Sequence, residues 1–455
     1  MDIKMTVLVV DDSGTMRMLF KKNLQQVGFE NIILATDGQD ATEKLELQRI
    51  DLVISDWNMP RMDGLDLVKW MRANDKYKAI PFIMATAQGD KTQQKIARDA
   101  GANNHIAKPF TAEQLKECID EVFGMKKETE PTETRRFVNG KVVMKVAHIQ
   151  ITDHLLLGVL KHWIQTGKVT PKYFELDTLC NPGWNPIQQS LEKGDIDGAF
   201  VLAPIAMDLF GYGAPIKLVL LAHKNGSIFV RSSRHSEDDY ASPKSLFKYK
   251  VVNIPHKMSI HNMLAHKYLS ELGLRPGVPG KKAIDVRFEV VPPIQMPQIM
   301  KENDEVAGFI VAEPIGSNAI AKKIAVRQFL SHEIWPNHPC CIVTFRQEFI
   351  EQYPDAVHEF VALLVQAGKF IESHKDEAAA IAVNFLDPEK KIGLTIEVLG
   401  RVLNEPGGIT LNDLSPIHED FDTIQRYMHE KMEIGVLIDV EKFIDMRFSQ
   451  NAHQL

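Results

Sequence analysis

Residues 6 to 123 alternate short apolar runs with longer amphipathic segments. Five apolar runs, VLVV, IILAT, DLVIS, PFIMAT and HIAK, are each followed by a segment whose apolar side chains recur at helical spacing. Strands of a parallel sheet have this character, because crossover helices cover both faces of the sheet and bury every strand. The pattern therefore predicts a doubly wound α/β domain with a five-stranded parallel sheet.

Polar side chains end four of these five runs: Asp11 and Asp12, Asp56, Thr86, and Lys108. The carboxyl ends of parallel strands lie along one edge of a sheet, where ligands bind. Three carboxylates that meet there repel one another unless a divalent cation lies between them, and purely oxygen ligands favour a hard ion such as Mg²⁺. Each aspartate alone also suits a helix N-cap or a turn. Their joint occurrence at successive strand ends favours the metal site.

The motifs VVDDS, SDWNMPRMDGL, MATA and HIAKPF resemble the receiver domain of bacterial response regulators and are most similar to the single-domain chemotaxis type. We assign this domain to residues 1–123. The resemblance implies that Asp56 accepts a phosphoryl group from a sensor histidine kinase. It also implies that Mg²⁺ is held by Asp11, Asp12, Asp56 and the main-chain carbonyl of Asn58.

The same resemblance implies roles for three further residues. Thr86 binds the phosphoryl group on activation, and Lys108 pairs with it. The added charge on Asp56 then draws both side chains inward and changes the surface elsewhere. His105 stands at a switch position that often holds Tyr or Phe in the family. Two interpretations of His105 remain open, an altered or pH-sensitive switch and an ordinary surface histidine.

A charged segment, GMKKETEPTETRR at residues 124–136, has almost no apolar side chains and is predicted to be a linker. The stretch after it, residues 137–455, is longer than one hydrophobic core usually supports, so a two-lobed α/β domain is expected. Within it, HIQITDH, PGWNPIQQSLEKGDIDGAFVLAP and VVNIPHKMSIHNMLAHKYL place helix starts after strands, where main-chain N–H groups can hold an anion. Ordinary capping residues and a core Trp184 are the alternative interpretation.

The longer pattern resembles solute-binding proteins of ABC transporters for nitrate, bicarbonate and sulfonates. The segments that carry the resemblance run from GDIDGAFVLAP and KNGSIFV through SIHNMLAHKYLSELGL and VAEPIGSNAI to HEIWPNHPCCIVTFRQEF. The resemblance implies a type 2 periplasmic-binding-protein-like fold. Its lobes and crossings are expected as follows: lobe I at residues 137–230 and 341–455, lobe II at residues 231–340, and crossings near Ser227–Ser232 and Cys340–Phe345.

The pocket motifs of that family match five residues of this chain: Thr152, Asp153, Trp184, His261 and Glu313. A carboxylate such as Glu313 repels a bare anion, whereas it can hold a ligand that donates a proton or arrives with a cation. This disfavours nitrate. Bicarbonate, an amine-bearing sulfonate, or another small polar molecule or oxyanion remains possible.

The formal net charge of −7 gives no general reason for this chain to bind nucleic acid or an anionic membrane. The sequence also has no helix-turn-helix pattern with a basic recognition helix. The first apolar run is too short for a secretory signal or a membrane span, so we expect a cytoplasmic protein without membrane insertion. Four cysteines, none in a CxxC pair, are expected to be reduced core thiols: Cys118, Cys180, Cys340 and Cys341.

These features predict a two-component response regulator whose second domain binds a small molecule, and which catalyses only its own phosphoryl transfer and dephosphorylation. Phosphorylation and ligand binding would bias one another, or act on a downstream protein that the sequence does not identify. Two alternatives remain. One is an enzyme related to thiamin-pyrimidine synthases, which share the fold but need a reactive histidine and a cysteine-rich metal-binding segment. The other is a transport receptor or scaffold whose receiver only docks to a partner.

Overall fold

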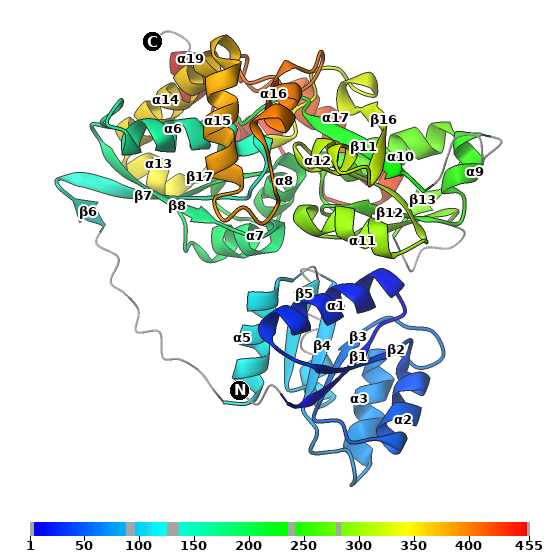
Figure 1. The fold of residues 1–455 in the computed structure, drawn as a ribbon. Helices are drawn as coiled ribbons and strands as arrows, with labels where there is room; N and C mark the ends of the chain where they lie inside the picture. The colour runs from blue at the N-terminus through cyan, green and yellow to red at the C-terminus, as the bar shows by residue number, and fades with distance from the viewer. Residues whose placement is uncertain are drawn as a thin grey trace. The chain divides into compact units, whose positions relative to one another are not determined.

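The computed structural model describes six stretches of the chain: residues 4–87, 96–108, 110–124, 136–234, 242–278 and 284–452. The chain divides into two compact units, residues 1–133 and residues 134–455 (Figure 1). Most of the predicted linker, residues 124–136, lies outside the described residues. Among the helices that the structure describes, none is both long enough and apolar enough to cross a bilayer.

The first unit contains a five-stranded parallel sheet in the order β2–β1–β3–β4–β5. Its strands are β1 (Thr6–Val10), β2 (Asn31–Ala35), β3 (Leu52–Asp56), β4 (Phe82–Ala87) and β5 (Asn104–Lys108). The chain moves from β1 outward to β2 and then back past β1 to β3, so the winding reverses between β1 and β3. The predicted doubly wound fold is confirmed, and its switch point lies where a ligand is expected.

The helices whose full bounds the structure describes cover both faces of this sheet (Figure 1): α1 (Gly14–Val27) and α5 (Ala112–Val122) on one face, α2 (Gly38–Leu47) and α3 (Gly64–Ala73) on the other. Strand β1 sends Val7 and Val9 into the first core and Leu8 and Val10 into the second. This alternation is the period of two that any strand imposes. The helix predicted after β4 lies partly outside the described residues.

The second unit contains two sheets, each at the centre of one lobe. The first-lobe sheet consists of β6 (Phe137–Val138), β7 (Lys141–His148), β8 (Phe174–Cys180), β9 (Gly198–Leu202), β10 (Ile216–Leu221) and β17 (Cys341–Arg346). The second-lobe sheet has the order β13–β14–β12–β15–β11–β16. Its strands are β11 (Ser227–Ser232), β12 (Val251–Ile254), β13 (Pro276–Gly277), β14 (Val286–Val290), β15 (Val306–Ala312) and β16 (Ala325–Leu330).

Helices flank both sheets of the second unit (Figure 1). Those of the first lobe are α6 (Leu155–Gln165), α7 (Trp184–Lys193), α8 (Ala203–Gly211), α13 (Gln347–Gln352), α14 (Pro354–Ser373), α15 (Lys375–Leu386), α18 (Val440–Phe443) and α19 (Met446–Ala452). Those of the second lobe are α9 (Pro243–Phe247), α10 (Ile260–Glu271), α11 (Met296–Glu302) and α12 (Ile315–Ala321). Two further helices contact both lobes: α16 (Ile396–Asn404) packs on α15 and α12, and α17 (His418–Met432) packs on α8 and α10.

The chain passes between the two lobes twice. Residues 222–226 join β10 to β11, and residues 331–340 join β16 to β17. We expected crossings near Ser227–Ser232 and near Cys340–Phe345. Both strands are already paired within a lobe sheet, so each passage falls in the residues just before the strand.

Candidate functional site

Three aspartates meet at the carboxyl edge of the first unit's sheet. Asp11 directly follows β1 and Asp56 ends β3. The two strands are parallel and Val10 pairs with Ser55, so the next residue of each strand lies beside the other. Asp12 joins them, and one carboxylate oxygen from each aspartate lies within 4.8 Å of the other two. The structure therefore brings the predicted acidic residues together.

Lys108 reaches this cluster from the end of β5. Its Nζ lies 2.5 Å from Asp11 Oδ2 and 2.7 Å from Asp56 Oδ1. Burial raises the pKa of Asp11 to about 7, although the positive charge of Lys108 opposes the shift. Burial alone lowers the pKa of Lys108, but the carboxylates of Asp11 and Asp56 raise it overall. Three carboxyl groups beside one ammonium form a donor set that suits a divalent cation.

The other predicted residues of the first unit lie on or next to the same strands. Thr86 lies one residue before the end of β4, and its buried hydroxyl has no hydrogen-bond partner among the described residues. Asn58 follows β3 by two residues and its side chain is exposed. His105 is half-buried in β5, where burial and the charge of Arg98 lower its pKa. The unpaired Thr86 hydroxyl is thus available to a group bound at this edge.

The acidic residues are not the caps of the neighbouring helices. Ser13 caps α1 by accepting a hydrogen bond from the Met16 N–H at 3.2 Å, and Asp63 caps α3. Asp11 Oδ1 instead accepts a hydrogen bond from the Ser13 N–H at 2.9 Å. The N-cap explanation therefore fails for Asp11 and Asp56.

Sequence reasoning missed the role of Gly64, the first residue of α3. A Cβ at this position would lie 2.0 Å from the main-chain oxygen of Asp56. The Gly64 N–H also donates a hydrogen bond to Trp57 O at 2.9 Å. Only glycine lets the start of α3 approach the end of β3 this closely, and the MDG motif at residues 62–64 was the available signal.

In the second unit, the 3₁₀ turn η1 (Thr152–His154) contacts the end of β15. The main-chain N–H and the Oγ1 of Thr152 both donate hydrogen bonds to the main-chain oxygen of Glu313, at 2.9 and 2.6 Å. Thr152 follows a strand of the first lobe and Glu313 follows a strand of the second, so these bonds join the lobes. Thr152 and Glu313, two of the predicted ligand residues, are therefore in contact, and Glu313 takes part through its main-chain oxygen.

The carboxylate of Glu313 points to a different partner. It accepts hydrogen bonds from Ser317, from the N–H at 2.9 Å and from the Oγ at 2.6 Å. Burial raises the pKa of Glu313 to about 7, although the Ser317 hydrogen bonds oppose the shift. A cavity of about 260 Å³ lies beside it, and its polar lining residues are Ser227, Glu313, Ser317, Arg327, Arg401 and Glu405.

Asp153 belongs to a buried cluster that sequence reasoning missed. Its Oδ2 lies 2.9 Å from His223 Nε2 and 3.4 Å from Cys341 Sγ, and Cys340 completes the group. The two cysteines are free and buried, as expected. Cys180, in contrast, is exposed, because it ends β8, which pairs only with β7.

Trp184 and His261 are buried residues at helix starts. Trp184 begins α7 and packs edge-on against His154, with 5.7 Å between ring centroids. His261 lies near the start of α10, and its Nε2 is 3.0 Å from Ser227 Oγ. Burial lowers the pKa of His261 to about 3, so the ring is neutral. Within the described residues, Trp184 Nε1 and His261 Nδ1 are buried without a hydrogen-bond partner.

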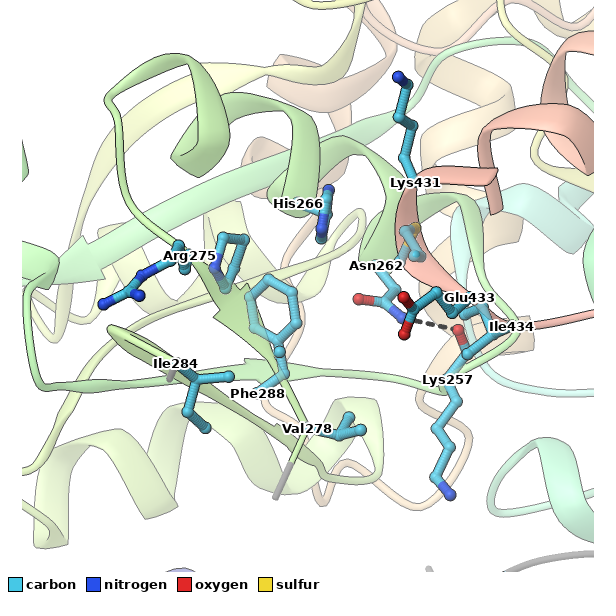
Figure 2. Close-up of a pocket in the computed structure, with 13 residues that line it drawn as sticks. Lys257, Asn262, His266, Arg275, Val278, Ile284, Phe288, Lys431, Glu433 and Ile434 are labelled. Carbon is cyan, nitrogen blue, oxygen red and sulfur yellow. Dashed lines mark hydrogen bonds between the residues drawn. The ribbon is translucent and has the colours of Figure 1, made fainter. Parts of the chain in front are cut away.

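A larger cavity, of about 500 Å³, lies on the second lobe (Figure 2). Its charged or titratable lining residues are Lys257, His266, Arg275, Lys431 and Glu433. Arg275 is paired with Asp285 at 2.9 Å. The described lining includes none of the five predicted ligand residues, so this cavity is separate from the predicted ligand site.

Family comparisons agree with this division. The model of the response regulator receiver domain matches residues 7–120, and the model of the NMT1-like family matches residues 140–386, which is more than half of the chain. The chemotaxis protein CheY1 of Helicobacter pylori is 48% identical over 121 residues, which cover 26% of this chain and 98% of that protein. The CheY homologue of Campylobacter jejuni is 45% identical over 121 residues, with 26% and 93% covered. The predicted receiver resemblance is confirmed.

Solved structures share the fold of the second unit. The ligand-binding component of an ABC-type import system from Staphylococcus aureus has a TM-score of 0.58 at 21% identity and covers 68% of this chain and 98% of its own. The periplasmic nitrate-binding protein of Synechocystis has a TM-score of 0.59 at 19% identity and covers 69% and 88%. These likenesses confirm the predicted solute-binding-protein-like fold.

Proposed function

Because this chain belongs to the NMT1-like family, and its first unit to the response regulator receivers, we propose that it is a two-component response regulator with a small-molecule-binding module. In this proposal a sensor histidine kinase phosphorylates Asp56. The observation that carries it is the meeting of Asp11, Asp12 and Asp56 with Lys108 at one edge of the sheet.

The residues at this edge supply a nucleophile, a counter-charge and a hydrogen-bond donor. A carboxylate oxygen of Asp56 attacks the phosphorus of a phosphohistidine, so that an O–P bond forms while the P–N bond breaks and the imidazole leaves. Asp11, Asp12, Asp56 and the Asn58 carbonyl would hold Mg²⁺, which would supply positive charge against the phosphoryl oxygens. Lys108 pairs with the new charge on Asp56, and the buried Thr86 hydroxyl turns to donate a hydrogen bond to it.

Acetyl phosphate tests this chemistry directly. Incubation of the full chain with acetyl phosphate and Mg²⁺ should add the mass of one phosphoryl group, and the Asp56→Asn variant should show no addition. The Asp75→Asn variant is a matched control, because Asp75 is an exposed aspartate of the same unit whose carboxylate pairs with Lys78 at 2.6 Å. An unchanged wild-type mass in the presence of Mg²⁺ would refute the proposal.

The second unit is proposed to bind a small polar molecule or oxyanion between its lobes. The unpaired polar atoms of Trp184 and His261, described above, support this place. Glu313 favours a ligand that carries a donor or a cation, because its carboxyl ionises near neutral pH. We therefore propose bicarbonate or an amine-bearing sulfonate before nitrate.

Thermal unfolding of the full chain tests the ligand class, because a bound ligand raises the apparent stability by mass action. At pH 8, bicarbonate or taurine should raise the unfolding temperature of the second unit, and nitrate should not. The Glu313→Gln variant should gain a response to nitrate, because the repelling charge is gone. A nitrate response of the wild type at pH 8 would contradict the proposed role of Glu313.

Phosphorylation and ligand binding are proposed to influence one another. Ligand affinity measured with and without beryllofluoride, a phosphoryl mimic, should differ, and equal affinities would exclude coupling without excluding phosphoryl transfer. The fold shared with import-system components supports one alternative, a transport receptor with a docking receiver. Cell fractionation decides between them, because a histidine kinase donates its phosphoryl group in the cytoplasm, where we place this protein.

A further inference from the structure

Four side chains with metal-binding atoms meet inside the second unit, at the place where its lobes are joined. They are Asp153, His223, Cys340 and Cys341, all fully buried, with one ligand atom of each within 4.8 Å of the others. Asp153 lies in η1 after a first-lobe strand. His223 lies in the first passage between the lobes, and the two cysteines lie where the second passage ends and β17 begins.

Protein hydrogen bonds alone do not satisfy this cluster. His223 Nε2 lies 3.1 Å from the Cys341 N–H, which donates to it, and 2.9 Å from the carboxylate oxygen Oδ2 of Asp153. A ring nitrogen carries either a proton or a lone pair, so one of these two contacts is unfavourable in either tautomer. Among the described residues, Asp153 Oδ1 is also buried without a hydrogen-bond partner. An orphaned carboxylate oxygen beside two buried thiols indicates that a group is missing from the cluster.

We propose that Asp153, His223, Cys340 and Cys341 bind a divalent transition metal of borderline softness, with zinc as the reference ion. Two sulfur ligands, one nitrogen and one oxygen match the preferences of such an ion and not those of Mg²⁺. Binding releases the two thiol protons and any proton shared by His223 and Asp153, so the metal replaces protons in the cluster. This proposal does not depend on phosphorylation of the first unit.

Four protein ligands complete a tetrahedral set, which is the arrangement of structural sites and leaves no open position. The ion therefore ties three separate segments together, namely η1 and both passages between the lobes. Metal binding should restrict the movement of one lobe against the other. The competing explanation is an ion pair alone: burial lowers the pKa of His223, but Asp153 raises it overall to about 10.

Metal content and cobalt spectra of the full chain test the proposal. Protein purified without chelator should contain about one zinc-class ion per chain. After removal of metal under reducing conditions, added Co²⁺ should produce thiolate-to-cobalt absorption in the near ultraviolet and ligand-field bands of a tetrahedral site, and added zinc should abolish both. A wild-type chain that shows no thiolate-cobalt band would refute the metal site and leave the ion pair.

Four variants locate the cobalt signal. Cys341→Ser and His223→Gln should each lower cobalt affinity by at least the roughly tenfold that loss of a ligand's hydrogen-bond partner costs, because each removes a ligand itself. Cys180→Ser, which removes an exposed thiol, should leave the spectrum unchanged. Loss of the band in Cys180→Ser alone would place the metal at that thiol and overturn the proposal. Asp56→Asn should keep the thiolate-to-cobalt absorption, because Asp56 lies in the first unit, so failure here is distinguishable from failure of the phosphorylation proposal.

Discussion

The buried carboxyl of Glu313 makes the stability of the second unit depend on pH. Its pKa is about 7 in the folded protein, compared with 4.5 for an unperturbed glutamate. Between these values the folded state holds a proton that the unfolded chain has released, so stability falls as the pH rises. Because one pH unit corresponds to about 1.4 kcal/mol, the complete loss above pH 7 comes to about 3 kcal/mol.

The Glu313→Gln substitution should remove this pH dependence. The glutamine oxygen still accepts the hydrogen bond from the Ser317 N–H, and the new amide can donate to the Ser317 hydroxyl once that hydroxyl turns. Glutamine therefore imitates the protonated acid. The variant should be about as stable as the wild type at pH 4.5, and more stable by about 3 kcal/mol at pH 8.

Calorimetry of the full chain between pH 4.5 and pH 8 measures this difference. The transition of the second unit is compared between wild type and variant, and the transition of the first unit serves as an internal control, because Glu313 lies outside it. Other carboxyl groups titrate in both proteins and cancel in the comparison. Two parallel pH profiles would show that the carboxyl is not desolvated and would refute the reasoning.

Three further substitutions test the first unit. Gly64→Ala should destabilise the first unit by about 2 kcal/mol or more in urea unfolding, because the new Cβ would lie 2.0 Å from Asp56 O. Gly400→Ala is the control: its Cβ meets no atom within 4 Å, so it should not destabilise the second unit. Lys108→Met should lower the stability of the first unit in Mg²⁺-free buffer, because it leaves the carboxylates of Asp11 and Asp56 without their counter-charge, and added Mg²⁺ should restore much of that stability. A stabilisation by Mg²⁺ no larger than that of the wild type would contradict a metal site here. Thr86→Val should cost less than about 1 kcal/mol, because the hydroxyl it removes has no partner among the described residues, and a larger loss in urea unfolding would reveal one.

The site of the first unit could be predicted because its residues directly end strands. Five short parallel strands that stand side by side bring their carboxyl ends to one edge, so Asp11, Asp56 and Lys108 meet whatever fills the core beneath them. Gly64 was harder to foresee, because its role depends on how closely α3 approaches the end of β3. Ser13 caps α1 and Asp63 caps α3, so the capping role belongs to these residues and not to Asp11 or Asp56.

The second unit was less predictable because its contacts depend on how two sheets are joined. Asp153 and Cys341 are 188 residues apart and come together only because both passages between the lobes return to the same place. His223 stands in a passage where no periodic pattern marks it. The motifs identified both Thr152 and Glu313. They could not show that Thr152 bonds the main-chain oxygen of Glu313, because that contact depends on how the two lobes pack.

The bond between the lobes at Thr152 uses only the carbonyl of residue 313, which every amino acid possesses. The acidity beside the cavity resides in the side chain of the same residue. At residue 313, the main chain therefore joins the two lobes, and the side chain sets the charge beside the cavity. If the proposed ligand role of Glu313 holds, a change to a neutral or basic side chain would alter the preferred solute while the Thr152 hydrogen bonds to the main-chain oxygen of residue 313 keep their donors and their acceptor.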